Sequence, residues 1–559
     1  RRELESSPTR LLTPVLKMQK SYDQAFGEFS AMAVKVGRGP RAARRAFTRA
    51  VERQQAFERR LHEEGRRALQ RLDSLPDTFG IVLFGRPYNA FVDEANMGVP
   101  HKLASRNHMV IPHDMLPVDH VNVDRRMFWA MGQKLMKAAQ FVALRNNLFG
   151  VYITNFSCGP DSFIVSFFRE HMRSKPSLTL ELDQHTADAG IDTRIEAALD
   201  IIRAWKQSRH DRPAIDSHAT FREARVGGEG YPTVTASDGS RYSLFDPRVE
   251  LVLPSMGSYS ARFAAATLRS TGINARALPV PDKDVLAAGH GHTTCKECLP
   301  YIVTTGSFLE HLRNRRDPSV RVTLLFMVTG GGPCRLGQYH RGLEQTIRRL
   351  KLRDVAVFTL SDENGYAGLG ARTLVRAWQA LVTADVLGDI RSMLRVTAED
   401  REAAEAEVDS CVRSLTGFFE GRLSVRLPVL LGHIARRLGS IPLRHDPATV
   451  PVVSLVGEIF VRREEFSRNN VVEYLEERGF MVRVAPVAEY VCYSNYVIHE
   501  GLGEREFSPA GIIKMKVSAY AQEWWERRIK SILAESGLYR FEMIEVKKTI
   551  EGVEHLINR

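Results

Sequence analysis

One pattern constrains the fold of this 559-residue chain more than any other, because it occurs three times. An apolar run is followed by a Gly/Pro-containing loop, a helical stretch and a second apolar run, and the three copies begin at residues 79, 249 and 450. Each copy has about the 30 residues of a βαβ unit, in which a helix connects two parallel strands. The sequence therefore predicts several α/β domains.

The stretches between these copies set the expected boundaries. We predict a multi-domain α/β protein with Rossmann-like parallel sheets and a helical N-terminal segment. The expected parts are a basic helical segment at 1–75, a first α/β domain at 76–215, a connector at 216–245, a second α/β domain at 246–385, a helical segment at 386–448 and a third α/β unit at 449–559. The connector contains "TVTASDGSRYSL", which alternates around Asp-Gly and predicts a hairpin. We expect the third unit to be truncated, since the chain ends in a helical pattern without a stop signal.

The formal net charge of +12 raises the question of a nucleic-acid partner. Much of the excess lies at 36–72, where helical spacing predicts an apolar stripe with arginines on the other faces. The stripe consists of Phe47, Val51, Phe57, Leu61 and Leu69. We interpret the arginines as a solvated face and expect no nucleic acid, because the aromatic-plus-basic motifs of RNA-binding modules are absent. No apolar run is long enough for a membrane span and no secretory signal opens the chain, so we expect a cytoplasmic protein without a membrane partner.

Four of the six cysteines stand where a loop is expected to lead into a helix. Cys158 follows an apolar run, Cys334 follows a Gly-Gly-Gly-Pro loop, and Cys295 and Cys298 form a C-x-x-C pair before a helical run. Free N–H groups at a helix N-terminus stabilise the negative charge of thiolates and of an iron–sulfur core. Nearby glycines let the backbone approach such a core closely. We therefore predict that Cys158, Cys295, Cys298 and Cys334 bind one metal group.

Spacing alone does not separate a zinc ion from an iron–sulfur cluster. We favour a 4Fe-4S cluster, because a structural zinc site usually draws on two local knuckles, whereas here one C-x-x-C is joined by isolated cysteines from distant loops. Two other interpretations stay open: a cysteine after a strand can be a small buried hydrophobic residue, and a lone C-x-x-C can be a redox-active dithiol. Cys411, in a helical pattern, and Cys492, in a strand-like run, are expected in the core.

Other polar residues give no catalytic assignment. Histidines 290 and 292 lie near the C-x-x-C, but in a Gly-rich loop we expect them to face solvent. Asp93, Glu94, His101 and His113 occur close together in the first α/β domain, where we expect helix caps and surface positions. The catalytic residues are therefore unknown.

Several long motifs, in order, resemble one known family. They include "GRPYNAFVDEANMGVPHKLASRNHMVIPHDMLP", "GVYITNFSCGPDSF", "PSLTLELDQHTADAGIDTRIEA", "TTCKECLP", "GPCRLGQY" and "DENGYAGLG". Together they resemble the proteins called acyl-CoA dehydratase activase-related, or CoA-substrate-specific enzyme activases, in their C-terminal, cluster-bearing half. That half is similar to 2-hydroxyacyl-CoA dehydratase (2-hydroxyglutaryl-CoA dehydratase) subunits and to double-cubane cluster proteins. The resemblance begins at about residue 76.

The resemblance implies a low-potential iron–sulfur protein of anaerobic metabolism that works with an ASKHA-type activase. Such an activase hydrolyses ATP to transfer one electron to its partner's cluster, and the family makes Cys158, Cys295, Cys298 and Cys334 candidate ligands. No ASKHA phosphate loops and no G-x-x-x-x-G-K-[ST] sequence occur in this chain, so we expect ATP on a partner chain or on an upstream domain.

We therefore predict a 4Fe-4S electron-transfer or reductase component of an ATP-driven activase system. One alternative is a 2-hydroxyacyl-CoA dehydratase-like subunit that acts directly on CoA esters. The other is a zinc-stapled scaffold that binds nucleic acid through its basic helix.

Overall fold

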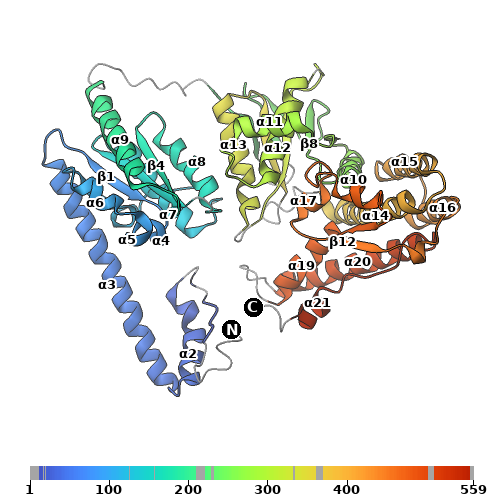
Figure 1. Ribbon diagram of the computed structural model, residues 1–559, viewed down its shortest axis with the longest axis horizontal. Coiled ribbons are helices and arrows are strands. Elements are labelled where there is room, and N and C mark those ends of the chain that lie inside the picture. Colours follow the sequence, from blue (N-terminus) through green and yellow to red (C-terminus); the bar gives the residue numbers. More distant parts are fainter. Residues whose placement is uncertain are drawn as a thin grey trace. The chain divides into compact units, whose positions relative to one another are not determined.

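The structure is a computed structural model that describes residues 12–16, 18, 21–124, 126–155, 158–208, 221–227, 232–315, 317–330, 334–360, 369–500 and 509–553. The chain forms two compact units (Figure 1): unit 1 is Arg1–Pro213 and unit 2 is Ala214–Arg559.

Unit 1 contains a four-stranded parallel sheet in the order β2-β1-β3-β4. The strands are β1 (Gly80–Phe84), β2 (Met109–Pro112), β3 (Leu148–Asn155) and β4 (Ser177–Leu182). The helices of this part are α4 (Pro87–Ala90), α5 (Asp93–Asn96), α6 (Val99–Ala104), α7 (Ala130–Leu144), α8 (Asp161–Met172) and α9 (Asp188–Ser208), with a 3-10 turn η2 (His113–Met115). The two central strands are apolar and buried along almost their whole length, as expected where helices cover both faces of a sheet.

The basic N-terminal stretch forms the 34-residue helix α3 (Pro40–Asp73), preceded by η1 (Tyr22–Ala25) and α2 (Phe26–Lys35). Its predicted apolar stripe is buried at both ends and exposed in the middle. Phe47 packs on the rings of Phe26 and Phe29 of α2, Leu69 is buried, and Phe57 is 58% exposed. The stripe therefore anchors the two ends of α3.

Unit 2 begins with the antiparallel strands β5 (Arg225–Gly227), β6 (Thr233–Thr235) and β7 (Arg241–Ser243). The predicted hairpin around Asp-Gly is thereby confirmed. A second four-stranded parallel sheet follows, in the order β11-β10-β8-β9, with β8 (Val249–Leu253), β9 (Asn274–Ala277), β10 (Val322–Val328) and β11 (Val355–Leu360). Its helices are α10 (Ser258–Arg269), α11 (Lys283–His292), α12 (Leu299–Asn314) and α13 (Tyr339–Leu350), with a 3-10 turn η4 (Arg335–Gln338).

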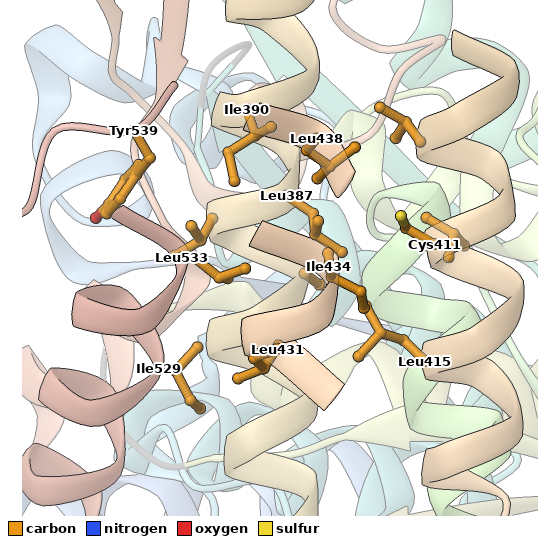
Figure 2. Packing of buried hydrophobic residues seen from close by; sticks show 14 of the residues in the cluster. Leu387, Ile390, Cys411, Leu415, Leu431, Ile434, Leu438, Ile529, Leu533 and Tyr539 are labelled. Atoms are coloured by element: carbon orange, nitrogen blue, oxygen red, sulfur yellow. The ribbon is translucent and has the colours of Figure 1, made fainter. Parts of the chain in front are cut away.

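The remainder of unit 2 is mainly helical. The helices α14 (Gly370–Thr397), α15 (Arg401–Phe419), α16 (Leu427–Gly439) and α20 (Pro509–Ala534) share one apolar core. Figure 2 shows Leu387, Leu415, Leu431 and Leu533 in that core, together with Cys411, which is fully buried as expected.

A short two-stranded parallel sheet lies beside this helical core. It consists of β12 (Val452–Leu455) and β13 (Met481–Val484). The other elements here are η6 (Pro447–Thr449), α17 (Ile459–Arg463), α18 (Val471–Glu476), α19 (Val487–His499) and α21 (Val546–Val553). The strand expected at Cys492 is wrong, because this residue lies in α19, where its half-buried side chain packs on the helical core.

The predicted fold class is confirmed: the protein is α/β, with several parallel sheets and a helical N-terminal region. The finer division into the predicted domains stays a prediction. Within the described ranges, none of the helices combines the length and the apolar character that crossing a membrane requires.

Candidate functional site

Both four-stranded sheets have a cysteine in the loop that follows the third strand of the sheet. Cys158 comes after β3 and just before α8, and Cys334 comes after β10 as the N-cap residue of η4, which leads into α13. In each sheet the strand order reverses between the first and third strands, β1 and β3 or β8 and β10. Ligands of open parallel sheets bind in the crevice at such a reversal. The topology therefore places both cysteines at a preferred ligand position.

Buried polar groups surround Cys158 in unit 1. The carboxylate of Asp161, at the start of α8, accepts hydrogen bonds from Tyr152 (3.1 Å) and Thr154 (2.7 Å) of β3. The Arg86 guanidinium, from the loop after β1, lies 3.6 Å from the same carboxylate. Since Asp161 and Tyr152 are almost completely buried, this network ties the loop after β1 to the strand and helix on either side of Cys158.

The Cys158 thiol is half-buried, and its charge state depends on this network. Burial raises the pKa of the Cys158 thiol, and the negative charge of Asp161 raises it further, while the positive charge of Arg86 opposes the shift. The hydroxyl of Tyr88 is within hydrogen-bond reach of the thiol. A thiolate at this position would therefore have one cation and one hydroxyl donor beside it.

In unit 2 the C-x-x-C loop is folded around its own acidic residue. The carboxylate of Glu297 accepts hydrogen bonds from the N–H and hydroxyl of Thr294 (3.1 and 2.8 Å) and from the N–H of Lys296 (3.2 Å). Cys295 has a left-handed backbone (φ +61°), and Cys298 is the N-cap residue of α12. The left-handed conformation of Cys295 therefore makes the chain turn sharply between the two cysteines.

The helices on either side of this loop pack with almost no space between them. Gly306 of α12 faces the backbone of Val285 in α11, and Gly289 of α11 faces the backbone of Ile302 in α12. A β-carbon at either glycine would collide with the facing carbonyl group. The two glycines therefore set the geometry of the helix pair that carries Cys295 and Cys298.

A hydrogen bond joins the Cys334 loop to the C-x-x-C loop. The guanidinium of Arg335 donates to the carbonyl of Lys296 over 3.4 Å. Cys298 and Cys334 are close enough for their charges to influence each other, and the Tyr339 hydroxyl lies beside the Cys298 thiol. Burial raises the pKa of Cys298, and the Tyr339 hydroxyl and the Arg335 charge oppose that rise.

Three of the four predicted ligands therefore belong to one neighbourhood of unit 2: Cys295, Cys298 and Cys334. Cys158 belongs to unit 1. All four thiols are free, so their donor chemistry fits a thiolate-bound metal group. Within the described residues, however, no three His, Cys, Asp or Glu side chains are already arranged to hold a metal ion. The ligand assignment stays a prediction.

The two histidines near the C-x-x-C differ in exposure. His290 is exposed and His292 is partly buried, and both end the helix α11 where a Gly-rich loop was expected. The Cys295 thiol lies 3.6 Å from the backbone carbonyl of His290.

The surface position expected for His113 is wrong. Its ring is buried, lies 3.1 Å from the Gly85 carbonyl through Nε2, and stacks on Phe84. Burial lowers the pKa of this histidine. By contrast, His101 and Asp93 are exposed and lie 3.9 Å apart. Asp93, His101 and His113 therefore do not share one environment.

Sequence reasoning missed the residues that surround the thiols, namely Arg86, Tyr88, Asp161 and Tyr339. A signal existed for the first two, because they follow β1 directly in "GRPY", at the carboxyl edge of the sheet. Residues 331–333 before Cys334 and most of the motif "DENGYAGLG" lie outside the described residues.

Comparison with known proteins identifies one domain. Residues 2–116 match the family model described as CoA enzyme activase uncharacterised domain (DUF2229). This match supports a CoA-enzyme activase-related protein and so confirms the family resemblance. It includes α3, which the motif resemblance did not cover, and it ends before the first of the four cysteines. No curated protein and no solved structure matches the chain.

Proposed function

We propose that this chain is an iron–sulfur electron-transfer or reductase component of an ATP-driven activase system. The family match supports the activase relationship, and the sequence motifs around the cysteines suggest the cluster. The observation that carries the proposal is the neighbourhood in unit 2 where the C-x-x-C loop and the Cys334 loop are joined through Arg335 and Lys296.

In this proposal Cys295, Cys298 and Cys334 supply three thiolate ligands, and Cys158 is the candidate for a fourth. A 4Fe-4S cluster bound there would take up and release one electron at a time. The protein's own groups would stabilise the negative charge of the thiolates. The Tyr339 hydroxyl lies beside Cys298, the Arg335 guanidinium adds positive charge, and Cys298 is the N-cap residue of α12, where the helix dipole favours negative charge.

The electron donor in this scheme is an ASKHA-type activase that carries the ATP, on another chain or on an upstream part of the same chain. A CoA ester is a candidate substrate of the system, and dehydration of a 2-hydroxyacyl-CoA by this chain itself is the finer version of the proposal. Both versions depend on a metal group bound by these cysteines.

The first experiment measures iron, sulfide and zinc in the chain purified without oxygen. We expect about four irons and four sulfides per chain. The double variant Cys295→Ala, Cys298→Ala should lose most of both, because two of the ligands are removed. Cys492→Ala is the matched control, since this half-buried thiol lies in α19 and is not among the predicted ligands.

Zinc without iron in the wild-type chain would contradict the electron-transfer proposal and favour a structural zinc site. Iron that stays bound in the double variant would show that the cluster has other ligands. If Cys492→Ala lost as much iron as the double variant, the loss would reflect damage to the fold and not a ligand.

A further inference from the structure

A small polar cavity lies in unit 2, away from the cysteines in sequence, where β8 leads into α10. Its volume is about 70 Å³, several times the space that one water molecule requires. The N-terminus of α10, the helix α14 and the segment from α17 to α18 line it. The cavity thus lies at the carboxyl edge of the second sheet, beside the strand at which the strand order reverses.

One of the protein's own carboxylates already reaches the N-terminus of α10. The backbone N–H of Ser258 donates to Oε1 of Glu465 over 2.9 Å, although the two residues are 207 positions apart. The free N–H groups and the dipole of a helix N-terminus favour an anion at this position. Gly257, which precedes the helix, has φ +91° and lets the backbone approach Arg463 closely.

Several buried donors around this carboxylate have no hydrogen-bond partner. They are Oγ of Ser260, Nε of Arg463 and Nε of Arg468, and all three residues line the cavity. Arg463 is only 9% exposed, and it already forms an ion pair with Asp385 (2.8 Å) through another nitrogen. Oε2 of Glu465 is also buried without a partner. Buried polar atoms are normally satisfied, so these donors indicate space for an additional acceptor.

Charged side chains of both signs line the cavity. Four arginines line it, at positions 391, 395, 463 and 468, against four acidic residues, at positions 389, 465, 473 and 476. Among these arginines, Arg395 is already paired with Glu476 (3.1 Å) and Glu405 (2.9 Å). Because Asp385 and Glu405 also pair with these arginines, a bound anion would take the place of the Glu465 charge and would not fill a deficit of negative charge.

We propose that this cavity binds one tetrahedral oxyanion, a phosphate group, in exchange for the Glu465 carboxylate. The phosphate oxygens would accept from the N–H groups at the start of α10, from the Ser260 hydroxyl and from Arg463 and Arg468. The cavity has room for the phosphate group alone. The group is therefore either a free ion or the end of a larger phosphorylated ligand whose remainder lies outside the cavity. The proposal does not depend on the presence of a metal cluster.

The experiment titrates the full chain with inorganic phosphate and with phenyl phosphate in a calorimeter. We expect saturable binding, and Glu465→Gln should bind about tenfold more tightly, because the competing negative charge is removed from the helix N-terminus. Ser260→Ala and Arg468→Gln should each weaken binding about tenfold, because each removes a donor. Arg422→Gln is the matched control, since this arginine is 73% exposed and does not line the cavity.

Tighter binding of phenyl phosphate would support a larger ligand, and tighter binding of inorganic phosphate would support a free ion. The proposal is overturned if the wild type and Glu465→Gln both show no saturable binding, since the cavity would then hold water only. It is also overturned if Arg422→Gln weakens binding as much as Arg468→Gln, since the binding would then be nonspecific. Circular dichroism of each variant establishes that it is folded.

Discussion

The four-stranded sheets of units 1 and 2 share one strand order, and each has a cysteine in the loop after its third strand, but the connections that surround these cysteines differ. In unit 1, irregular chain and the single helix α7 connect β2 to β3. In unit 2, the closely packed pair α11 and α12 connects β9 to β10 and carries the C-x-x-C between its helices. The comparison shows that both sheets share the position of one loop cysteine, while the crossover of unit 2 carries two further cysteines in its own loop.

The charges near the two cysteines also differ. In unit 1 the helix after Cys158 begins with the buried acid Asp161, whose charge is compensated by Arg86. In unit 2 Cys334 is followed directly by Arg335, and the first turn of η4 contains no acidic residue. The buried acid of unit 1 therefore lies in the helix after the cysteine, whereas the buried acid of unit 2, Glu297, lies within the C-x-x-C loop, and an arginine lies near a thiol in both units.

The largest effect is expected from breaking the network of unit 1. Asp161→Ala removes the acceptor of Tyr152 and Thr154 and leaves the half-buried charge of Arg86 without its partner. We expect the free energy of unfolding of unit 1 to fall by about 3 kcal/mol, measured by urea denaturation. Asp188→Ala is the control: this acid is 67% exposed, so the loss of its ion pair with Lys102 should change the stability much less. Equal losses in both variants would show that the buried network has no special role.

A smaller effect is expected from separating the helix pair of unit 2. Gly306→Ala places a methyl group against the backbone of Val285, so α11 and α12 must move apart. We expect a loss of about 2 kcal/mol in the unfolding of unit 2, together with less bound metal, because the C-x-x-C loop connects these helices. Gly291→Ala, in the last turn of α11, is the control, because its β-carbon would meet no atom within 4 Å. If Gly306→Ala kept full stability and metal content, the close packing would not be what positions the loop.

The two units are also expected to differ in their response to pH. In unit 2, burial raises the pKa of Asp389 to about 7, and burial also raises the pKa of Glu476. In unit 1, hydrogen bonds lower the pKa of Asp183 and Asp192. An acid with a raised pKa holds its proton more tightly in the folded state, so its stabilising contribution is complete below its unfolded pKa and is lost as the pH rises through the folded value.

For Asp389 this window extends from its ordinary pKa of 3.8 to about 7. The charged groups that face it are Arg483, Arg463 and Lys530, which lower its pKa, and Asp385, which raises it. We expect the unfolding free energy of unit 2 to fall by on the order of 1 kcal/mol as the pH rises from about 5 to about 8, and to fall less in Asp389→Asn. Denaturant titrations at several pH values measure the difference between the two curves. Parallel curves would show that Asp389 has an ordinary pKa.

The local pattern of the sequence was sufficient to determine most secondary structure. The run from Val322 to Val328, the helix that starts at Asp161 and the hairpin around Asp-Gly all form where hydrophobic periodicity and turn residues predicted them. Cys492 was assigned to a strand because a short apolar run does not distinguish a strand from a partly buried helix. The positions of Cys158, Cys298 and Cys334 just before a helix followed from the same local signals.

Only the tertiary structure decided which side chains meet. The bond from Arg335 to Lys296, the cluster of Arg86 with Asp161 and the contact of Glu465 with the N-terminus of α10 join residues 39, 75 and 207 positions apart. No periodicity in the sequence encodes such distances, because they depend on how the strands are ordered and how closely the helices pack. The burial of His113 has the same cause, since the helices around the carboxyl end of β1 cover a residue that its own neighbours in sequence would leave exposed.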